Sequence, residues 1–276
     1  AIEEPESHLH PSAMHELRQA IQDLTEDSQV VVSTHNPIFV DREEISNNLL
    51  VSNNKVKAVK KIKEIRECLG IRTSDNLIHA NKMILVEGES DKKIITKILQ
   101  EQSPKLSKQI KDGDLGVFSL NSASKLSYNL KWFQDQLCSC FVILDKDKSG
   151  SESIQKHLVS KELDQKSYSL ITAKGLNESE IENLINIHFY SGIIFEKFGI
   201  DLLSTDFTKK KTKWSTSLSD ILNGLGKSIS LRDLDDVKKS IAEKVEKDGI
   251  YENISSHNLI FIDALIGQLE NYFIKS

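Results

Sequence analysis

Two apolar runs in this chain each end abruptly in acidic residues. Residues 83–86 lead into Glu87, and residues 141–144 lead into Asp145 and Asp147. A helical pattern follows each run, which predicts buried strands of an open α/β sheet, and such a sheet carries its chemistry at the carboxyl ends of its strands. Carboxylate oxygens are the ligands that Mg²⁺ and Mn²⁺ prefer. The sequence therefore predicts a metal site at this edge of the sheet.

Strand and helix patterns alternate through the middle of the chain. Strands are expected at 82–86, 115–120, 140–144 and 167–171, and helices between them at 90–100, 124–137 and 151–160. This order is typical of a mainly parallel sheet flanked by helices, which is an α/β fold. Ser90 is the expected N-cap of the first of these helices. The later part of the chain is mostly helical, with helices expected at 181–198, 217–225, 233–247 and 258–273.

The composition excludes several classes of protein. The 276 residues include 38% hydrophobic and 28% charged residues, which is ordinary for a globular chain of one large or two modest domains. No stretch is long enough for a membrane span and no signal-peptide pattern is present, so we expect no membrane partner and a cytoplasmic location. The three cysteines favour a reducing compartment. A net charge of −5 argues against a globally basic nucleic-acid binder but leaves room for a local basic surface.

The first residues carry a second acidic motif. The chain starts at Ala1 without a methionine, in what reads as the tail of a buried strand, so we expect it to be a fragment whose N-terminal part is missing. Glu3-Glu4-Pro5-Glu6 follows at once, and Leu9-His10-Pro11 comes next. A helical pattern then leads to a β-branched strand at 29–34 that ends at His35.

This order of strand, acidic pair, helix, strand and histidine resembles the Walker B and histidine-switch elements of ABC-type ATPases of the RecF/SMC-like branch. The resemblance implies that Glu3 supports Mg²⁺, Glu4 polarises the attacking water and His35 senses the γ-phosphate of ATP. The chain has no Gly-x-x-x-x-Gly-Lys-Ser/Thr loop to cradle phosphates. We therefore expect ATP to be a cofactor of a full-length protein and expect this chain alone not to hydrolyse it.

Further acids can join the metal site. Asp91 lies four residues after Glu87, one turn into the expected helix, and this spacing brings the two side chains to the same side of the turn. Glu180 and Glu182 supply another acidic cluster after the last strand, although a helix start that complements the dipole explains them as well. That alternative is weaker for Glu87 and the two aspartates, because unpaired acids at buried strand ends are costly without cations.

The Glu-Gly and Asp-x-Asp arrangement resembles a Toprim domain, the fold shared by topoisomerases, primases and a group of nucleases. An ABC ATPase half followed directly by Toprim resembles the OLD (overcoming lysogenization defect) family, which includes the Gabija nuclease subunit and the effector ATPases of some retrons. On this resemblance we expect residues 1–78 to be the C-terminal part of the ATPase with a connector. Residues 79–276 would be the Toprim nuclease domain, with a mostly helical part at 186–276.

The resemblance also implies roles for individual residues. Two divalent cations, Mg²⁺ or Mn²⁺, would be bound, one by Glu87 and Asp91 with Glu182 and Glu180 alongside, and the other by Asp145 and Asp147. Family members use a lysine from the C-terminal helices to neutralise transition-state charge, and Lys238 is the best match, with Lys239 close behind. A solvated helix face explains Lys238 equally well. The catalytic set is then Glu87, Asp145, Asp147 and Lys238.

Two lysine-rich stretches are candidates for nucleic-acid binding. Lys209, Lys210, Lys211 and Lys213 precede Trp214, and such a cluster can contact phosphates while the aromatic ring stacks on a base. A solvated loop is the plainer explanation. The lysines between residues 55 and 66 can likewise contact DNA or belong to an amphipathic connector helix.

The expected function is metal-dependent endonuclease activity, with two-metal hydrolysis of DNA regulated by the ATPase part, in antiphage defence. The alternatives are primase-like or topoisomerase-like Toprim chemistry, and a non-catalytic ATPase–Toprim scaffold that recruits a partner. Family resemblance implies a homo-oligomer and a nucleic-acid substrate, for which we favour DNA over RNA although the residues do not distinguish the two. A defence-system protein and a reverse transcriptase with its noncoding RNA are alternative partners. Carboxylates that lie far apart, or basic side chains that fill the gap between them, would contradict the nuclease hypothesis.

Overall fold

The computed structural model describes residues 1–7, 9, 11–25, 27–41, 44–52, 55–69 and 80–274. The chain forms two compact units, one of residues 1–81 with 132–138 and the other of residues 82–131 with 139–276. The domain boundary expected between residues 78 and 79 lies outside the described residues and stays a prediction. Helix α5 (Leu126–Asp135) begins in the second unit and ends in the first.

The first unit contains two small sheets. Strands β1 (Ile2–Glu3) and β2 (Val32–Ser33) are parallel, and α1 (Pro11–Leu24) connects them in sequence. Strands β3 (Leu49–Ser52) and β4 (Lys55–Ala58) form an antiparallel hairpin, followed by α2 (Ile62–Cys68). The connector helix expected for the lysines from residue 55 is therefore wrong over 55–58, where alternating lysine, valine and alanine suits an exposed strand.

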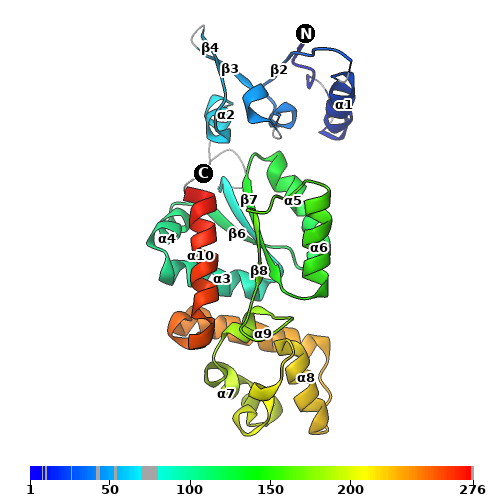
Figure 1. Cartoon of the computed structure of the whole chain (residues 1–276). Helices are drawn as coiled ribbons and strands as arrows, with labels where there is room; N and C mark the ends of the chain where they lie inside the picture. Colours follow the sequence, from blue (N-terminus) through cyan, green and yellow to red (C-terminus); the bar gives the residue numbers. More distant parts are fainter. Residues whose placement is uncertain are drawn as a thin grey trace. The chain divides into compact units, whose positions relative to one another are not determined.

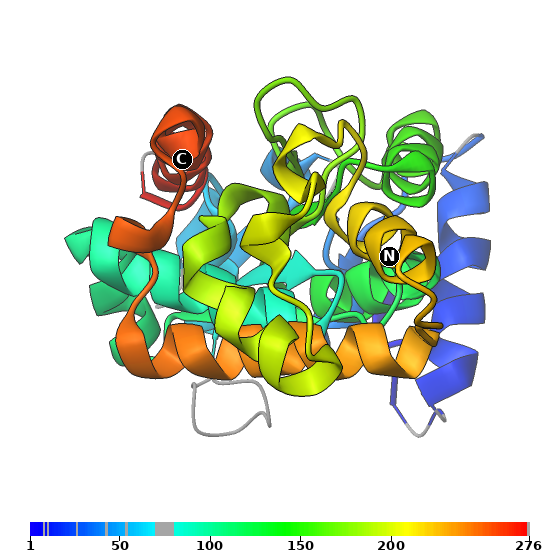
Figure 2. The ribbon, with the colours of Figure 1, turned by 90° about the horizontal axis from the view of Figure 1, so that it is seen from below.

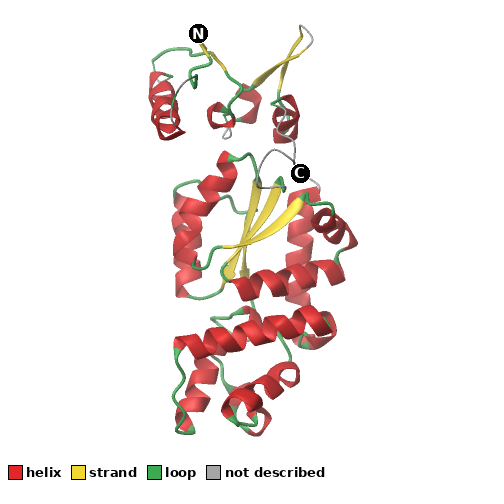
Figure 3. Ribbon diagram, turned by 180° about the vertical axis from the view of Figure 1, so that it is seen from behind, coloured by secondary structure: helices red, strands yellow, loops and turns green. Residues whose placement is uncertain are grey.

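The second unit is built on a four-stranded, all-parallel sheet in the order β6-β5-β7-β8 (Figure 3). Its strands run along the apolar segments expected from the sequence: β5 (Lys82–Val86), β6 (Leu115–Ser119), β7 (Ser139–Asp145) and β8 (Tyr168–Ile171). Near-continuous apolar strands of this kind are buried on both faces, which is typical of parallel sheets. The expected α/β fold with helices flanking a parallel sheet is confirmed.

Helices cover both faces of this sheet (Figure 1). On one face, alternate residues of the central strands, among them Ile84 and Phe141, share a core with α3 (Glu89–Gln102), α4 (Pro104–Lys111) and the last helix. On the other face, α6 (Lys148–Val159) packs on β7 and β8. The helix α4 was not expected, although Ser103 as its N-cap and Pro104 at its first turn are ordinary helix-start signals.

The C-terminal helices belong to the same core as the sheet. They are α7 (Ile187–Phe198), α8 (Trp214–Gly224), α9 (Leu231–Asp248) and α10 (Leu259–Ile274). Helix α9 runs across the unit and packs against α3 (Figure 2). Helix α10 returns to the sheet, where the rings of Tyr272 and Phe273 have centroids 5.4 and 6.3 Å from that of Phe141.

Two local expectations for this unit are wrong. The helix expected at 181–198 is interrupted, because a 3₁₀ turn at Ile181–Leu184 ends at Ile185 and Asn186 caps a new helix, α7. Gly88, and not Ser90, is the N-cap of α3. None of the helices in the part of the chain that the structure describes is both long and apolar enough to cross a membrane.

Candidate functional site

The acids at the strand ends lie at one edge of the sheet. Val86 of β5 pairs with Ile143 of β7, so Glu87 comes directly after one strand where Asp145 ends its neighbour. The Glu87 carboxylate accepts a hydrogen bond from the backbone N–H of Asp145, and the negative charge of Asp147 acts on Glu87. The parallel pairing thus brings together the carboxylates whose convergence the sequence predicted.

The turn after β7 depends on a glycine. Asp147 is the N-cap of α6 and its Oδ1 accepts a hydrogen bond of 2.9 Å from the backbone N–H of Gly150. A Cβ atom at Gly150 would lie 2.2 Å from the carbonyl oxygen of Asp145, which is an impossible contact. Helix α6 can therefore begin this close to the strand end only because residue 150 is glycine.

Asp91 is folded back toward the end of β5. Its Oδ2 accepts a hydrogen bond of 2.8 Å from the backbone N–H of Gly88, so the carboxylate helps to cap α3. Asp91 also interacts electrostatically with Glu87, Asp145 and Glu180. Its place one turn into the helix is the one expected from the four-residue spacing.

Glu180 and Glu182 reach the same site through a loop that is fixed beside β7. Ser179 makes a two-hydrogen-bond bridge with Lys146, with N···O distances of 2.9 and 2.8 Å, and the Ser179 Oγ donates to the Ile171 carbonyl at 2.8 Å. These contacts place the following 3₁₀ turn next to the strand ends. Glu182 then lies with its side chain fully buried, and its charge acts on Asp145.

Two lysines lie among these acids. The Nζ of Lys238, on α9, is 3.6 Å from the Glu180 Oε1 and 3.4 Å from the Glu182 Oε2. The Nζ of Lys213 is 2.9 Å from the Asp147 Oδ2 and 3.7 Å from the Glu180 Oε1. The acids converge as the nuclease hypothesis requires, and Lys238 lies where that hypothesis places a charge-neutralising lysine. Lys213 is a basic side chain that the hypothesis did not include, and it pairs with Asp147 without separating the other acids from one another. Lys239, the second choice for a neutralising lysine, is exposed.

Burial dominates the ionisation of four of the acids. It raises the pKa of Asp91 to about 6 and the pKa of Glu182 to about 7. Burial, with the like charge of Asp91, raises the pKa of Asp145 well above its ordinary value, and burial with the charge of Asp147 raises the pKa of Glu87. Desolvation disfavours the charged form of a carboxyl group, so each of these acids gains from a nearby cation.

For Asp147 and the two lysines, the surroundings instead favour the charged form. Burial alone would raise the pKa of Asp147, but the Gly150 N–H and the Lys213 ammonium outweigh it and hold the pKa below its usual range. Burial alone would lower the pKa of Lys213 and Lys238, but Asp147 for the first and Glu182 with Glu180 for the second raise it. Both lysines therefore remain charged and partly neutralise the acids.

The donor atoms suit a hard divalent cation. The site offers carboxylate oxygens, and Glu87 Oε2 and both carboxylate oxygens of Glu182 are buried and accept no hydrogen bond from another residue. Buried carboxylates without partners are unfavourable unless a cation compensates them. Within the described residues, however, no three His, Cys, Asp or Glu side chains gather closely enough to coordinate one ion. The residues fit a cation chemically, but side chains must move to bind it, Lys213 among them.

Glu180 has a structural role that the sequence did not indicate. Its Oε2 accepts from the backbone N–H of Ser215 at 2.7 Å, and its Oε1 accepts from the Ser215 hydroxyl at 2.8 Å. Glu180 thereby caps the first turn of α8, and both oxygens are engaged. Its assignment as a metal ligand stays a prediction.

The lysine cluster divides into two parts. Lys213 faces the acids, whereas Lys209, Lys210 and Lys211 are exposed and line a separate cavity. The sequence predicts all four as nucleic-acid-binding candidates and does not predict the contact of Lys213 with the acids. The only signal for this contact is its position immediately before α8, the helix that Glu180 caps.

The ATPase-like residues lie together in the first unit. The parallel pairing of Glu3 with Ser33 places Glu4 beside His35, whose Nε2 is 3.7 Å from the Glu4 Oε1. Glu4 has a φ of 41°, a backbone conformation that favours glycine and is found at strained functional positions. The histidine side chain is 86% exposed and the glutamate 52%, so the pair contributes little stability.

Glu6 connects the acidic turn and the histidine loop of this unit, a role that the sequence does not predict. Its Oε1 accepts hydrogen bonds from the Thr34 hydroxyl and, at 3.0 Å, from the backbone N–H of His35. Burial alone would raise the pKa of Glu6, but these hydrogen bonds outweigh it and lower the pKa. The acidic turn and the histidine loop are thus held in register by one carboxylate.

Comparison with known proteins agrees with this arrangement. A family model described as "AAA domain, putative AbiEii toxin, Type IV TA system" matches residues 1–41. A second model, "Overcoming lysogenization defect protein-like, TOPRIM domain", matches residues 78–147, which include β5, β7 and the acids at their ends. The two matches, in this order along the chain, support an OLD-family ATPase–Toprim protein.

A curated relative supports the same family. The Old nuclease of Escherichia phage P2 is 28% identical to this chain over 109 residues, which cover 34% of the chain and 19% of the relative. The chain thus matches about a fifth of that protein's length. The matched Toprim model ends at residue 147, and the structure adds Glu182, Lys213 and Lys238 to the site from the helical part that follows.

Proposed function

We propose that this OLD-family protein is a divalent-metal-dependent endonuclease whose active site is the acid cluster at the carboxyl edge of the Toprim sheet. The proposal is supported chiefly by one observation: the buried Asp145 and Glu182 and the partly buried Glu87 and Asp91 lie together, on separate segments, and burial raises the pKa of each. A protein keeps buried carboxylates at such a cost when a cation or reaction uses them. The phage P2 relative is named a nuclease, which agrees with this chemistry.

The carboxylates of the site are the expected ligands of the cations. Glu87, Asp91, Asp145, Asp147 and Glu182 would hold Mg²⁺ or Mn²⁺, with Glu180 alongside. When bound, such ions would supply an activated water and charge stabilisation for the leaving oxygen of a phosphodiester.

Lys238 and Lys213 would stabilise negative charge on the substrate. Lys238 presents an ammonium group on the acids from α9, where it can offset the negative charge that grows on a phosphate during attack. Lys213 can leave Asp147 for a phosphate, because a carboxylate that binds a cation no longer attracts the lysine as strongly.

The topoisomerase alternative has weaker support. That chemistry needs a tyrosine whose hydroxyl reaches DNA as a nucleophile. Tyr190 lies near Glu182, but it is 2% exposed and burial raises its pKa, which suits neither access nor activation.

We further propose that ATP, bound by a longer form of the protein, regulates cleavage. The match of residues 1–41 to an AAA domain and the contact of Glu4 with His35 support this link. DNA as the substrate, a homo-oligomeric assembly, a defence-system partner and a role in antiphage defence rest on the family resemblance.

Supercoiled plasmid tests the nuclease proposal. We expect Mg²⁺- or Mn²⁺-dependent nicking that EDTA abolishes and that both Glu87→Ala and Asp145→Ala lose. Asp263→Ala is the matched control, because Asp263 is an exposed acid on α10 of the same unit, away from the acids described here. Equal cleavage by all four proteins would indicate a contaminant and contradict the proposal, and a covalent protein–DNA adduct would support topoisomerase chemistry instead.

A further inference from the structure

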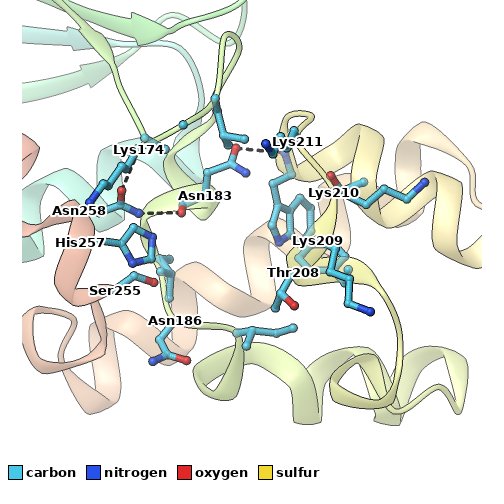
Figure 4. A pocket seen from close by; sticks show the side chains of 18 of the residues that line it. Lys174, Asn183, Asn186, Thr208, Lys209, Lys210, Lys211, Ser255, His257 and Asn258 are labelled. Atoms are coloured by element: carbon cyan, nitrogen blue, oxygen red, sulfur yellow. Dashed lines mark hydrogen bonds between the residues drawn. The ribbon is translucent and has the colours of Figure 1, made fainter.

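A cavity of about 780 Å³ lies in the helical part of the second unit and has no role in the chemistry described above (Figure 4). Its wall is formed by the loop after β8, the 3₁₀ turn that carries Glu182, the segment 207–212 and the turn before α10. The volume is in the range of ligand-binding pockets, so the cavity accommodates a small molecule or a short stretch of one chain rather than a nucleic-acid duplex.

The formally charged side chains that line the cavity are all positive among the described residues. Lys174, Lys209, Lys210 and Lys211 line the cavity together with two exposed histidines, His188 and His257. Among the described residues, none with an acidic side chain is part of the lining, although the whole chain has a net charge of −5. A hollow that concentrates positive charge in an acidic protein selects an anionic ligand.

The lysines are available to such a ligand. Lys209 pairs with Asp206 at 2.6 Å and Lys210 with Asp220 at 3.3 Å, but these partners are exposed surface acids, and such pairs are weak. Lys174 and Lys211 make no ion pair with another described residue. Figure 4 shows Lys174 and the lysine segment on opposite sides of the cavity.

The cavity is built on a fixed frame. The Asn258 Nδ2 donates to the Asn183 carbonyl at 3.1 Å, and its Oδ1 accepts from the backbone N–H of Lys174 at 3.0 Å. On the other side, Trp214 packs edge-on against Tyr190 with ring centroids 6.1 Å apart, and both rings are buried. The lysines therefore project from walls whose positions hydrogen bonds and aromatic packing define.

The cavity also shares two segments with the acid cluster. The Asn183 Oδ1 accepts from the backbone N–H groups of Glu180 and Trp214, at 2.9 and 3.0 Å, so a residue of the cavity wall orders the turn that carries the acids. Residues 209–211 face the cavity, while Lys213, two positions later, contacts Asp147. The segment 209–213 therefore links the cavity lining to the acid cluster.

We propose that the cavity binds the phosphate backbone of one nucleic-acid strand next to the cleavage site, an inference that rests on the proposed nuclease function. The lysines act as positioning residues, which hold the strand by charge and do not touch the scissile bond. The shared chemistry is phosphate binding, and continuity with the acid cluster favours a strand over a free nucleotide.

The test measures binding without cleavage. A fluorescein-labelled single-stranded oligonucleotide is titrated with the full chain in EDTA, and its anisotropy is followed over a series of NaCl concentrations. The variant is the triple substitution Lys174→Ala, Lys209→Ala and Lys211→Ala. The matched control removes the same charge from exposed positions on α4, with Lys105→Ala, Lys108→Ala and Lys111→Ala.

We expect the cavity variant to bind about ten-fold or more weakly and to lower the slope of log K against log salt by about 2, since each phosphate contact in a single strand contributes about 0.7. The α4 control keeps its affinity within about two-fold. Equal loss in both triple variants, or unchanged strand binding by the cavity variant, would overturn the proposal. Calorimetry with AMP identifies a free-nucleotide site if AMP binding is lost in the cavity variant while strand binding is not.

Failure of the two proposals can be told apart. Asp145→Ala should lose nicking but keep oligonucleotide affinity, because it leaves the cavity lysines in place. Binding that depends on the cavity without nicking by the unmodified chain would contradict the nuclease proposal alone. Nicking with unchanged binding by the cavity variant would contradict the cavity proposal alone.

Discussion

At the scale of single residues, Glu182 combines full burial with a carboxylate that accepts no hydrogen bond from another residue. Lys238 is its nearest cation, at 3.4 Å, yet burial still raises the pKa of Glu182 to about 7. The folded protein therefore holds a proton on Glu182 over a pH range where the unfolded chain releases it. Such a residue lowers the stability of the fold at neutral pH and is retained for another reason.

We expect Glu182→Gln to abolish nicking and to stabilise the fold in a pH-dependent manner. The folded pKa lies above the unfolded value, so the native protein loses stability as pH rises from about 4.5 to about 7, and the amide removes this loss. The gain in the free energy of unfolding should be absent at pH 4 and reach on the order of 1–3 kcal/mol at pH 8. Urea unfolding at the two pH values measures it, and a gain independent of pH would contradict the assignment.

Gly150 gives a second prediction at this scale. A methyl group there would lie against the Asp145 carbonyl, so Gly150→Ala must push α6 away from the strand end. We expect the free energy of unfolding to fall by about 2 kcal/mol or more. Nicking should also be lost, because relief of the contact displaces the Asp145 backbone and with it the carboxylate.

Gly192→Ala is the control for this change, because Gly192 lies inside α7 and a Cβ there meets no atom within 4 Å. Alanine in a helix interior should be neutral or stabilise by up to about 1 kcal/mol. Thermal melts of the two variants compare them directly, and similar behaviour would refute the close contact at Gly150.

At the scale of elements, the site depends on short turns as much as on strands. The 3₁₀ turn Ile181–Leu184 and the start of α8 are joined through Asn183, whose Oδ1 accepts from two backbone N–H groups. This one amide fixes the segment that carries Glu180 and Glu182 to the segment that carries Lys213.

Asn183→Ala should therefore cost about 1–3 kcal/mol, because it leaves the N–H groups of Glu180 and Trp214 without their acceptor. Asn223→Ala, an exposed position on α8, should stay within about 0.5 kcal/mol. Chemical denaturation of both variants measures the difference. An Asn183→Ala protein as stable as its control would show that the turn is held by other contacts.

The sequence predicted the strand ends and not these turns, for a physical reason. An apolar run followed by an acid is local information, and parallel pairing then brings Glu87 and Asp145 together. Lys213 is 66 residues from Asp147, and no local pattern reports that contact. The 3₁₀ turn also has the apolar character of the helix after it, so the break at Asn186 was missed and one continuous helix was expected.

At the scale of the whole molecule, protons and cations compete for the same buried acids. Because the pKa of Asp91 is about 6 and that of Glu182 about 7, both acids are mostly protonated at pH 5.5 in the folded protein and mostly ionised at pH 8. Cation binding requires the ionised form, so it should strengthen as pH rises through this window.

We expect Mn²⁺ to raise the melting temperature by several degrees at pH 8 and by much less at pH 5.5. A cation at one hundred times its dissociation constant stabilises a fold by about 2.7 kcal/mol. Differential scanning fluorimetry with and without Mn²⁺ measures the shift, and Asp145→Ala should remove it. An equal shift at both pH values, or one that survives in Asp145→Ala, would place the bound cation elsewhere.

The last helix of the described chain has a consequence for biosynthesis. Helix α10 covers one face of the sheet, where Tyr272 and Phe273 pack on Phe141 and the Ser103 hydroxyl donates to Glu270 at 2.6 Å. During translation, this face of the sheet cannot be covered by α10 until residues 259–274 have left the ribosome. Stop codons or stalled translation before Leu259 should therefore release chains with an open apolar sheet face, which chaperones or proteases would have to handle.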